Sequence, residues 1–415
     1  MVRNKKTYKI DNMSENRSVD KICMVTSGYI PVPAIKGGAI EQLVQLLIDK
    51  NESDRLFDFT VITCDIEDES VHKRYCSTKF IYIKHSKYSK IIKKIRRGLK
   101  KIIKYDCWML DRYNRMVSDY LKKNGAEFKY IVDEGCVDFQ VFKSVAKICG
   151  REKIVIHLHA EIFSNPLIER VFGNALAISK FVEKGFKDSL HSNIKVALLY
   201  NAVDLSRFQK HITSEEKRQI RLSLGLTNDD FVVIYCGRLI PEKGVKELVE
   251  AVINLKQSDI KLVIVGSSAF QGAVLTDFQK ELQVIAQDKR IIFTGFVDNR
   301  ELYKYHQMAD VGAVPSVWGE GFCVSLVEMM ASGLPTIVTR RGGLVEVGTE
   351  ETSMFIEWEH NLADNIQEGI LSLYGNSHRL ESMAGKSRQR ALVFDGQNYL
   401  ENYRGALILL DNMKS

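Results

Sequence analysis

Short apolar runs rich in β-branched residues alternate along the chain with longer segments whose apolar residues recur at helical spacing. In the first half such runs predict strands at residues 21–27, 57–64, 79–84, 129–134, 153–159 and 175–179. Helices are predicted between them, for example at 40–49 and 138–149. Near-continuous apolar strands separated by helices are typical of a parallel sheet covered on both faces.

The second half repeats this alternation. It predicts strands at 231–237, 260–266, 290–295, 311–316 and 334–339, and helices at 246–254, 276–286, 300–308 and 324–332. Two such series in one chain predict an α/β protein of two doubly wound, Rossmann-like domains that face each other across a cleft. Ligands would bind where the strands end.

The domain boundaries follow from the places where each alternation begins and ends. We expect a flexible arm at 1–20, a first domain at 21–205, a second domain at 206–395, and a C-terminal helix within 396–415. The join between the domains is predicted near residues 200–209. Periodicity alone leaves the partner of the last helix open, and the first domain is one candidate.

Composition favours a cytoplasmic protein. The first 20 residues are polar, without the apolar core of a secretory signal. No apolar run reaches the roughly 18–20 residues that a membrane span needs. The eight cysteines occur singly, without a CxxC pair, and several lie within strand-like runs. They are expected to be small core residues in a reducing compartment.

Charge is distributed unevenly between the two halves. Residues 1–205 hold 36 basic and 25 acidic residues, a net +11, whereas the remainder holds 23 and 27, a net −4. Segment 84–108, KHSKYSKIIKKIRRGLKKIIKYDCW, supplies most of the excess and spaces its apolar residues as a helix does. Such a helix favours an anionic membrane surface. The alternative is a surface helix packed on its own domain, and no motif supports a nucleic-acid partner.

The most informative string is PSVWGEGFCVSLVEMMASGLP at 315–335. A predicted strand ends at its start, a glycine-containing loop follows, and a helix begins near Cys323. The first amides of that helix are unpaired donors suited to phosphate or sugar oxygens. Glu320 lies in the loop, and Glu328 lies eight residues later within an apolar helical stretch. Taken singly, each carboxylate is better explained as a structural one.

Two further strings place glycines and cations after predicted strands. In YCGRLIPEKGVKELV at 235–249, Arg238 and Lys243 lie in a strand-to-helix loop, where they could bind a diphosphate. They could also be solvated surface cations. In SGYIPVPAIKGGAIEQLVQLL at 27–47, Gly37 and Gly38 open a helix and permit close backbone approach to a ligand.

HLHAE at 157–161 places two histidines at the end of a predicted strand. His157 and His159 alternate onto the same face, toward the expected cleft. Either could be a structural, hydrogen-bonded histidine. A metal site is a further possibility, but no DxD or HExxH string accompanies the pair.

Together these strings resemble glycosyltransferase family 4, the "group 1" retaining transferases of the GT-B fold. EGFCVSLVEMMASGLP resembles the family's EGFGLxxxEAMAxGxP string, GRLIPEKG its GRxxxxKG string, and KGGAIEQLVQLL its GGxxxxVxxLA string. ALAISKFVEKGF and YNAVDLSRF match two further strings, so that the resemblance covers nearly the whole chain after the arm. Cys323, Met329 and Ala202 depart from the family pattern.

The resemblance implies roles for matching residues. Arg238 and Lys243 would hold the donor diphosphate, and Glu328 would bind the ribose. Glu320 would contact the transferred sugar, and His159 would lie by its reacting end. The remaining donor-site candidates would act largely through backbone atoms: Gly37, Gly38, Val297, Phe322, Cys323, Val324 and Ser325.

The resemblance also implies a function. It is a retaining transfer of sugar from a UDP- or GDP-sugar to a glycan or polyprenyl-linked acceptor, without a metal or other cofactor, in bacterial capsule, exopolysaccharide or lipopolysaccharide biosynthesis. The enzyme would lie on the inner face of the cytoplasmic membrane as a peripheral protein. One alternative is a catalytically weak, membrane-associated scaffold with a transferase fold. A two-Rossmann oxidoreductase is disfavoured because the expected GxGxxG turn is absent.

Overall fold

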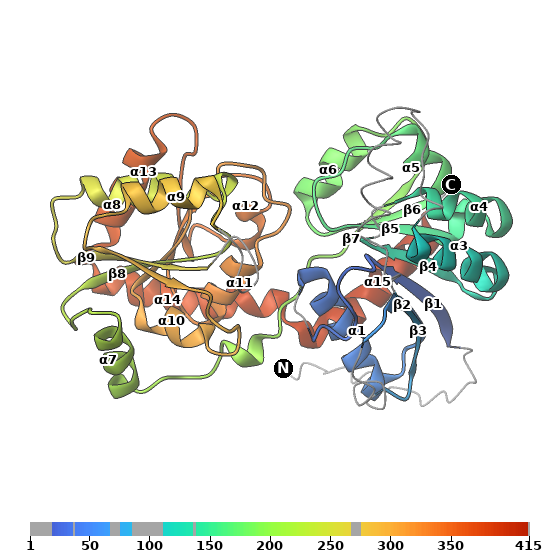
Figure 1. The fold of residues 1–415 in the computed structure, drawn as a ribbon, viewed down its shortest axis with the longest axis horizontal. Helices are drawn as coiled ribbons and strands as arrows, with labels where there is room; N and C mark the ends of the chain where they lie inside the picture. Colours follow the sequence, from blue (N-terminus) through green and yellow to red (C-terminus); the bar gives the residue numbers. More distant parts are fainter. Residues whose placement is uncertain are drawn as a thin grey trace, which may run out of the picture.

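The computed structural model describes residues 19–35, 38–66, 75–84, 111–135, 138–266 and 275–413. Two parallel sheets with helices around them lie side by side (Figure 1). The chain is thus the α/β protein of two doubly wound domains that its hydrophobic pattern predicts.

The first sheet has seven strands within the described residues, in the order β3-β2-β1-β4-β5-β6-β7. Its strands are β1 (Asp20–Thr26), β2 (Phe57–Cys64), β3 (Thr78–Ile83), β4 (Tyr130–Glu134), β5 (Ile154–Leu158), β6 (Asn174–Ala177) and β7 (Lys195–Leu198). The helices of this part are α1 (Ala39–Asp54), α3 (Arg112–Asn124), α4 (Gln140–Cys149), α5 (Pro166–Val171) and α6 (Lys180–Asp188).

The second sheet has six strands within the described residues, in the order β10-β9-β8-β11-β12-β13. They are β8 (Phe231–Cys236), β9 (Ile260–Val265), β10 (Ile291–Gly295), β11 (Val311–Val314), β12 (Thr336–Thr339) and β13 (Ser353–Ile356). Its helices are α7 (Ser214–Ser223), α8 (Val245–Asn254), α9 (Asp277–Ile285), α10 (Leu302–Met308), α11 (Val324–Ala331), α12 (Leu344–Val347), α13 (Leu362–Leu373) and α14 (Ser377–Ala391).

The central strands of both sheets are buried on both faces. Every residue of β4, β5 and β8 is buried, as expected for parallel strands covered by helices on each side. In each sheet the strand order reverses beside the first strand, between β1 and β4 and between β8 and β11. Ligands of open α/β sheets bind at such switch points, outside the carboxyl ends of the strands.

The last helix, α15 (Tyr399–Asn412), packs on the first sheet rather than the second. Tyr399, Tyr403 and Leu407 are buried in one apolar cluster with Phe57 and Phe59. The chain therefore crosses between the domains twice, and the crossings are hydrogen-bonded to each other. Val203 N donates to Phe394 O at 2.9 Å, and Gly396 N donates to Val203 O at 2.9 Å.

Within the described residues, the predicted strands and helices coincide with observed ones to within a few residues at their ends. The exceptions among strands are β7 and β13, which the hydrophobic pattern did not predict. Each has only four residues, and β13 begins with Ser353. Among the described residues, no helix combines the length and apolarity that crossing a membrane requires.

Candidate active site

A cavity of about 430 Å³ lies between the carboxyl edges of the two sheets. The first domain lines it with the start of α1 and with the segment after β5, which includes His159 and Glu161. The second domain lines it with the loop after β8, with Ser316 and with residues 318–325. Both domains therefore contribute to one site at the switch points of their sheets.

The cationic side of this cavity is formed by the loop after β8. Lys243 Nζ lies 2.5 Å from Glu320 Oε1, and Ser316 Oγ donates to the same oxygen at 2.7 Å. The side chains of Lys243 and Glu320 are only 18% and 6% exposed. Arg238 lines the cavity as well, and it is exposed. Two cations thus converge on the cavity, one of them held in place by a buried carboxylate.

Two glycines allow the loops around Glu320 to approach so closely. Gly244 has φ 66°, and a Cβ there would lie 1.9 Å from the carbonyl oxygen of Pro315. Gly342 has φ 54°, and a Cβ there would lie 2.7 Å from Glu320 O. The next amide, of Gly343, donates to Glu320 O at 2.7 Å. Both backbone positions require glycine, and together they fix the loop that carries Glu320.

Helix α11 begins at Val324, directly after this loop, with Cys323 at its N-cap. Residues 322–325 line the cavity, so the unpaired amides of the first turn lie at its wall. Glu328 lies in the second turn, beside a smaller adjoining pocket of about 100 Å³ that Arg207 and Asn299 also line. Burial raises the pKa of Glu328 to about 7, although the charge of Arg207 opposes the shift.

On the first domain, His159 faces the site from the end of β5. Its Nε2 lies 2.8 Å from Glu134 Oε2, and His157 Nδ1 lies 2.9 Å from the same oxygen. Burial acts to raise the pKa of Glu134, but the two histidines outweigh it and hold that pKa well below its usual range. Burial and the neighbouring His157 lower the pKa of His159 to about 4, so its ring is neutral at pH 7.

Glu134, His157 and His159 are also the group of described residues whose atoms could hold a metal ion, since one ligand atom of each lies within 4.8 Å of the others. The observed contacts are those of two imidazole N–H groups sharing one carboxylate oxygen. The residue types fit zinc, whereas the distances fit hydrogen bonds.

Comparison with known proteins shows which families this chain resembles. Residues 216–390 match the model of the family described as "Glycosyl transferases group 1". Spore coat protein SA of Bacillus subtilis is 24% identical over 403 residues, which cover 92% of this chain and 97% of that protein. The chain is a glycosyltransferase whose second domain matches the group 1 family. The matched residues form the second domain, which carries Lys243, Glu320 and Glu328.

Two further similarities describe this glycosyltransferase. Lipopolysaccharide 1,2-N-acetylglucosaminetransferase of Salmonella typhimurium is 24% identical over 212 residues, covering 50% of this chain and 54% of that protein. The crystal structure of Anabaena Alr3699/HepE in complex with UDP-glucose has a TM-score of 0.69 at 18% identity, over 94% of this chain and 99% of that one. The fold is GT-B.

The structure brings most of the candidate residues of this glycosyltransferase together. His159, Arg238, Lys243, Glu320 and residues 322–325 line one cavity, and Glu328 lines the pocket that adjoins it. Gly38 is the N-cap residue of α1, whose first residues line the cavity.

The other candidates lie apart from the cavity or outside the described residues. Val297 follows β10 and packs against the apolar core, so the described part of the chain does not place its side chain in the cavity wall. Gly37 lies outside the described residues, as does segment 84–108 except for Lys84. The Lys84 ammonium lies 3.6 Å from Asp65.

Three residues that sequence reasoning missed contribute to the site. Glu134 binds both histidines, Ser316 binds Glu320, and Glu346 joins the domains. Glu134 carried a usable signal, because it is an acid at the end of the predicted apolar strand that precedes the strand ending in HLHAE. Ser316 lies four residues before Glu320, but nothing in that spacing reveals that its hydroxyl bonds the carboxylate. Glu346 carried no signal because its partners lie 146 to 166 residues away in sequence.

Glu346 of α12 links the two domains beside the cavity. Its carboxylate accepts from the amides of Lys180 and Phe181 at 2.8 and 2.7 Å, at the first turn of α6 in the first domain. Tyr200 Oη donates to it at 3.0 Å. A carboxylate from one domain thus caps a helix of the other, which stabilises the contact between the two domains.

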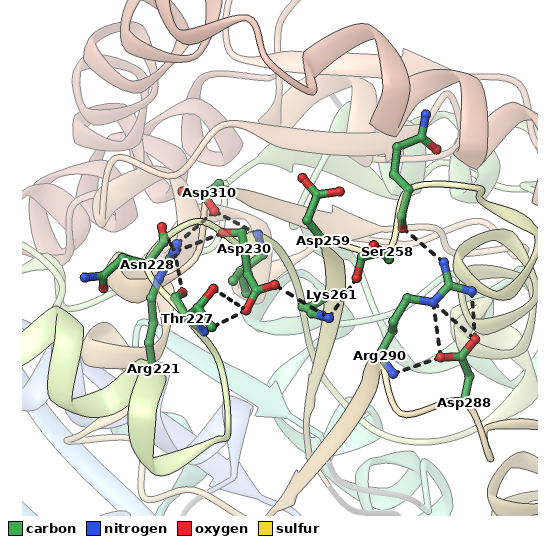
Figure 2. Close-up of polar contacts among 12 residues, drawn as sticks. Arg221, Thr227, Asn228, Asp230, Ser258, Asp259, Lys261, Asp288, Arg290 and Asp310 are labelled. Carbon is green, nitrogen blue, oxygen red and sulfur yellow. Dashed lines mark hydrogen bonds and ion pairs between the residues drawn. The ribbon is translucent and has the colours of Figure 1, made fainter.

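A separate polar network lies at the opposite, amino end of the second sheet (Figure 2). Arg221 is buried and donates to the carbonyl oxygens of Met308 and Asp230, each at 2.9 Å, and to Asp310 Oδ2 at 2.8 Å. Asp310 in turn accepts from Val232 N at 2.8 Å. These bonds satisfy the ends of β8 and β11, so this network is structural.

Proposed function

We propose that this enzyme transfers a sugar from a UDP- or GDP-sugar to a glycan or lipid-linked acceptor, with retention of anomeric configuration and without a metal ion. The observation that carries the proposal is the convergence of Lys243, Arg238 and the amides of α11 on a cavity that His159 closes from the other domain. The biosynthesis of a bacterial capsule, exopolysaccharide or lipopolysaccharide is the proposed setting.

The donor would bind mainly to the second domain. Its diphosphate would lie against Lys243, Arg238 and the first turn of α11, where positive charge and unpaired amides favour an anion. The two ribose hydroxyls would donate to Glu328 in the adjoining pocket. HepE, which shares the fold, was crystallised with UDP-glucose, and this supports a UDP-sugar as the first donor to test.

The chemistry would need little covalent help from the protein. As the bond from the anomeric carbon to the diphosphate breaks, negative charge grows on the leaving phosphate. Lys243, Arg238 and the α11 amides would stabilise that charge, which is the task a metal ion performs in other transferases. The leaving phosphate would accept the proton of the attacking hydroxyl on the same face, and no protein nucleophile is invoked.

Glu320 would act on the sugar rather than on the phosphate. One carboxylate oxygen accepts from both Lys243 and Ser316, which fixes the orientation of the group. The other oxygen would accept from a hydroxyl of the transferred sugar. His159 would contact the sugar near its reacting carbon from the opposite wall.

The acceptor side rests on the first domain and on segment 84–108. The Salmonella relative is named for lipopolysaccharide synthesis, and a basic amphipathic segment suits an enzyme whose acceptor is anchored in an anionic membrane. Each cation near such a surface would contribute about 1 kcal/mol. We therefore propose peripheral association with the inner face of the cytoplasmic membrane.

Two measurements test these proposals separately. Thermal-shift titration with UDP-, GDP- and ADP-sugars should reveal one nucleotide that raises the melting temperature, since a ligand stabilises in proportion to its occupancy. Stabilisation by none of them would contradict the donor assignment. Flotation with anionic vesicles should be lost when Lys93, Lys94, Arg96 and Arg97 become Gln, and flotation unchanged by those substitutions would contradict membrane binding.

A further inference from the structure

The carboxylate of Glu134 is buried beneath the cavity and makes contacts that the proposed mechanism does not use. Its side chain is 1% exposed, and Oε2 is shared by His157 and His159. The register of β4 and β5 pairs Asp133 with Ile156, which brings the next residue, Glu134, alongside His157. The pairing of β4 with β5 therefore brings Glu134 and His157 into contact.

Burying a carboxylate is costly unless donors compensate for the lost water. Here both compensating groups are imidazoles, and Glu134 Oε1 has no partner among the described residues. Replacing a buried polar cluster with apolar residues of similar volume is often neutral or stabilising. Packing alone therefore gives no reason for an acid at this position, which points to a further role.

The geometry determines what His159 can present to a ligand. Because Nε2 bonds to a carboxylate oxygen, Nε2 carries the hydrogen in the neutral ring. The remaining ring nitrogen, Nδ1, keeps a lone pair and is buried without a partner among the described residues. His157 packs against the ring with centroids 4.0 Å apart and restricts its rotation.

We propose that Glu134 is a positioning residue for sugar transfer, which fixes the orientation and tautomer of His159 from beneath the cavity. His159 then offers Nδ1 as an acceptor, with its ring already oriented and its hydrogen fixed on Nε2. The inference rests on the proposed function, because it assigns the role of His159 in the same cavity. Glu134 itself touches neither donor nor acceptor.

Two substitutions separate positioning from packing. Glu134→Leu keeps the approximate size but removes both acceptors, and Glu134→Gln keeps one oxygen that can accept from the histidines. We expect Glu134→Leu to lower kcat for release of UDP from UDP-glucose by about 10–100-fold, the usual effect of losing such a supporting hydrogen bond. KM should change little, and Glu134→Gln should recover much of the loss.

A double-mutant cycle with His159→Ala tests whether Glu134 acts through His159. If it does, Glu134→Leu lowers the rate in the wild-type background and has no further effect in the His159→Ala background. Additive losses in the double mutant would overturn the proposal. An equal loss of kcat in Glu134→Leu and Glu134→Gln would also overturn it, because the oxygen acceptor that Gln retains would then not contribute to the rate.

Three controls distinguish the positioning role of Glu134 from a folding defect, from metal binding and from failure of the proposed sugar-transfer function. Ser118→Ala removes another buried polar side chain of the same domain, between α3 and α4, and should leave kcat unchanged. A stoichiometric divalent ion in the purified protein that Glu134→Leu releases would overturn the positioning role. If wild type releases nucleoside diphosphate from no UDP- or GDP-sugar, or His159→Ala leaves the rate unchanged, the parent proposal fails instead.

Discussion

At the scale of single residues, the site depends on charges that are held in place before any ligand arrives. Sequence spacing predicted that Lys243 and Glu320 belong to one site. It could not predict that they form an ion pair, because 77 residues separate them and the contact depends on how two loops pack. Ser316 lies only four residues before Glu320, but its spacing did not reveal that its hydroxyl donates to the carboxylate and completes its orientation.

Glu328 gives a prediction in which stability and binding change in opposite directions. Because folding raises its pKa to about 7, the folded state favours the protonated carboxyl. The protonated carboxyl therefore contributes to the free energy of unfolding. That contribution is fully present below the unfolded pKa, near 4.5, and is lost as pH rises through 7. Glu328→Gln should therefore raise the free energy of unfolding at pH 8 by about 1–2 kcal/mol, but hardly at pH 5.

Urea denaturation at both pH values measures this effect. The same substitution should weaken stabilisation by the nucleotide, since an amide oxygen accepts less strongly than a carboxylate from two ribose hydroxyls. A stability difference that is equal at pH 5 and pH 8 would contradict the assigned protonation. Unchanged nucleotide binding would contradict the ribose contact.

At the scale of elements, the hydrophobic pattern predicted the buried central strands well and the short peripheral ones poorly. Strands such as β8 are apolar throughout, so both their existence and their parallel pairing follow from sequence. β7 and β13 are four residues long and lie at the ends of their sheets, where tertiary pairing rather than composition decides the conformation. Helix α15 was predicted, but its apolar face alone could not identify the sheet it covers.

The packing of α15 yields a stability prediction. Tyr403 is fully buried, and its ring lies 5.9 Å from that of Phe57 in an edge-on contact. Replacing such an aromatic side chain with alanine leaves a cavity and costs about 3–5 kcal/mol. Tyr403→Ala should lower the unfolding free energy of the first domain accordingly.

Chemical denaturation followed by circular dichroism provides the measurement. Ile408→Ala, at an exposed position of the same helix, is the matched control and should cost far less. If both variants lose the same stability, packing of Tyr403 on the first sheet does not explain the effect.

At the scale of the whole molecule, the cavity exists because two domains approach each other. Glycines in the Glu320 loop contribute to this approach, since a Cβ at Gly319 would lie 2.7 Å from the ring of Phe181 in α6. Glu346 adds hydrogen bonds to the same helix. The sequence predicted two facing domains, but their contacts join residues more than 100 positions apart and appear only in the folded chain.

Glu346→Ala should loosen the contact between the two domains. Without the carboxylate, two amides of α6 and the Tyr200 hydroxyl lose their acceptor, at a cost of about 1–3 kcal/mol. We expect a larger radius of gyration by small-angle X-ray scattering and a higher KM for the donor, with kcat less affected. Glu350→Ala removes an exposed ion pair with Arg340 in the second domain and should alter neither quantity. Identical scattering and KM in wild type and Glu346→Ala would contradict the interdomain role.

We propose above that Lys243 and its neighbours stabilise a departing nucleoside diphosphate without a metal. The most direct measurement is the release of nucleoside diphosphate from a panel of UDP-, GDP- and ADP-sugars in the presence of EDTA, for wild type, Lys243→Met and Lys246→Met. Lys246, an α8 cation paired with Glu281, is the control. We expect EDTA-resistant release from one donor class, about 10²–10³-fold slower in Lys243→Met than in the control. No release from any donor, release that EDTA abolishes, or equal rates in the two variants would contradict it.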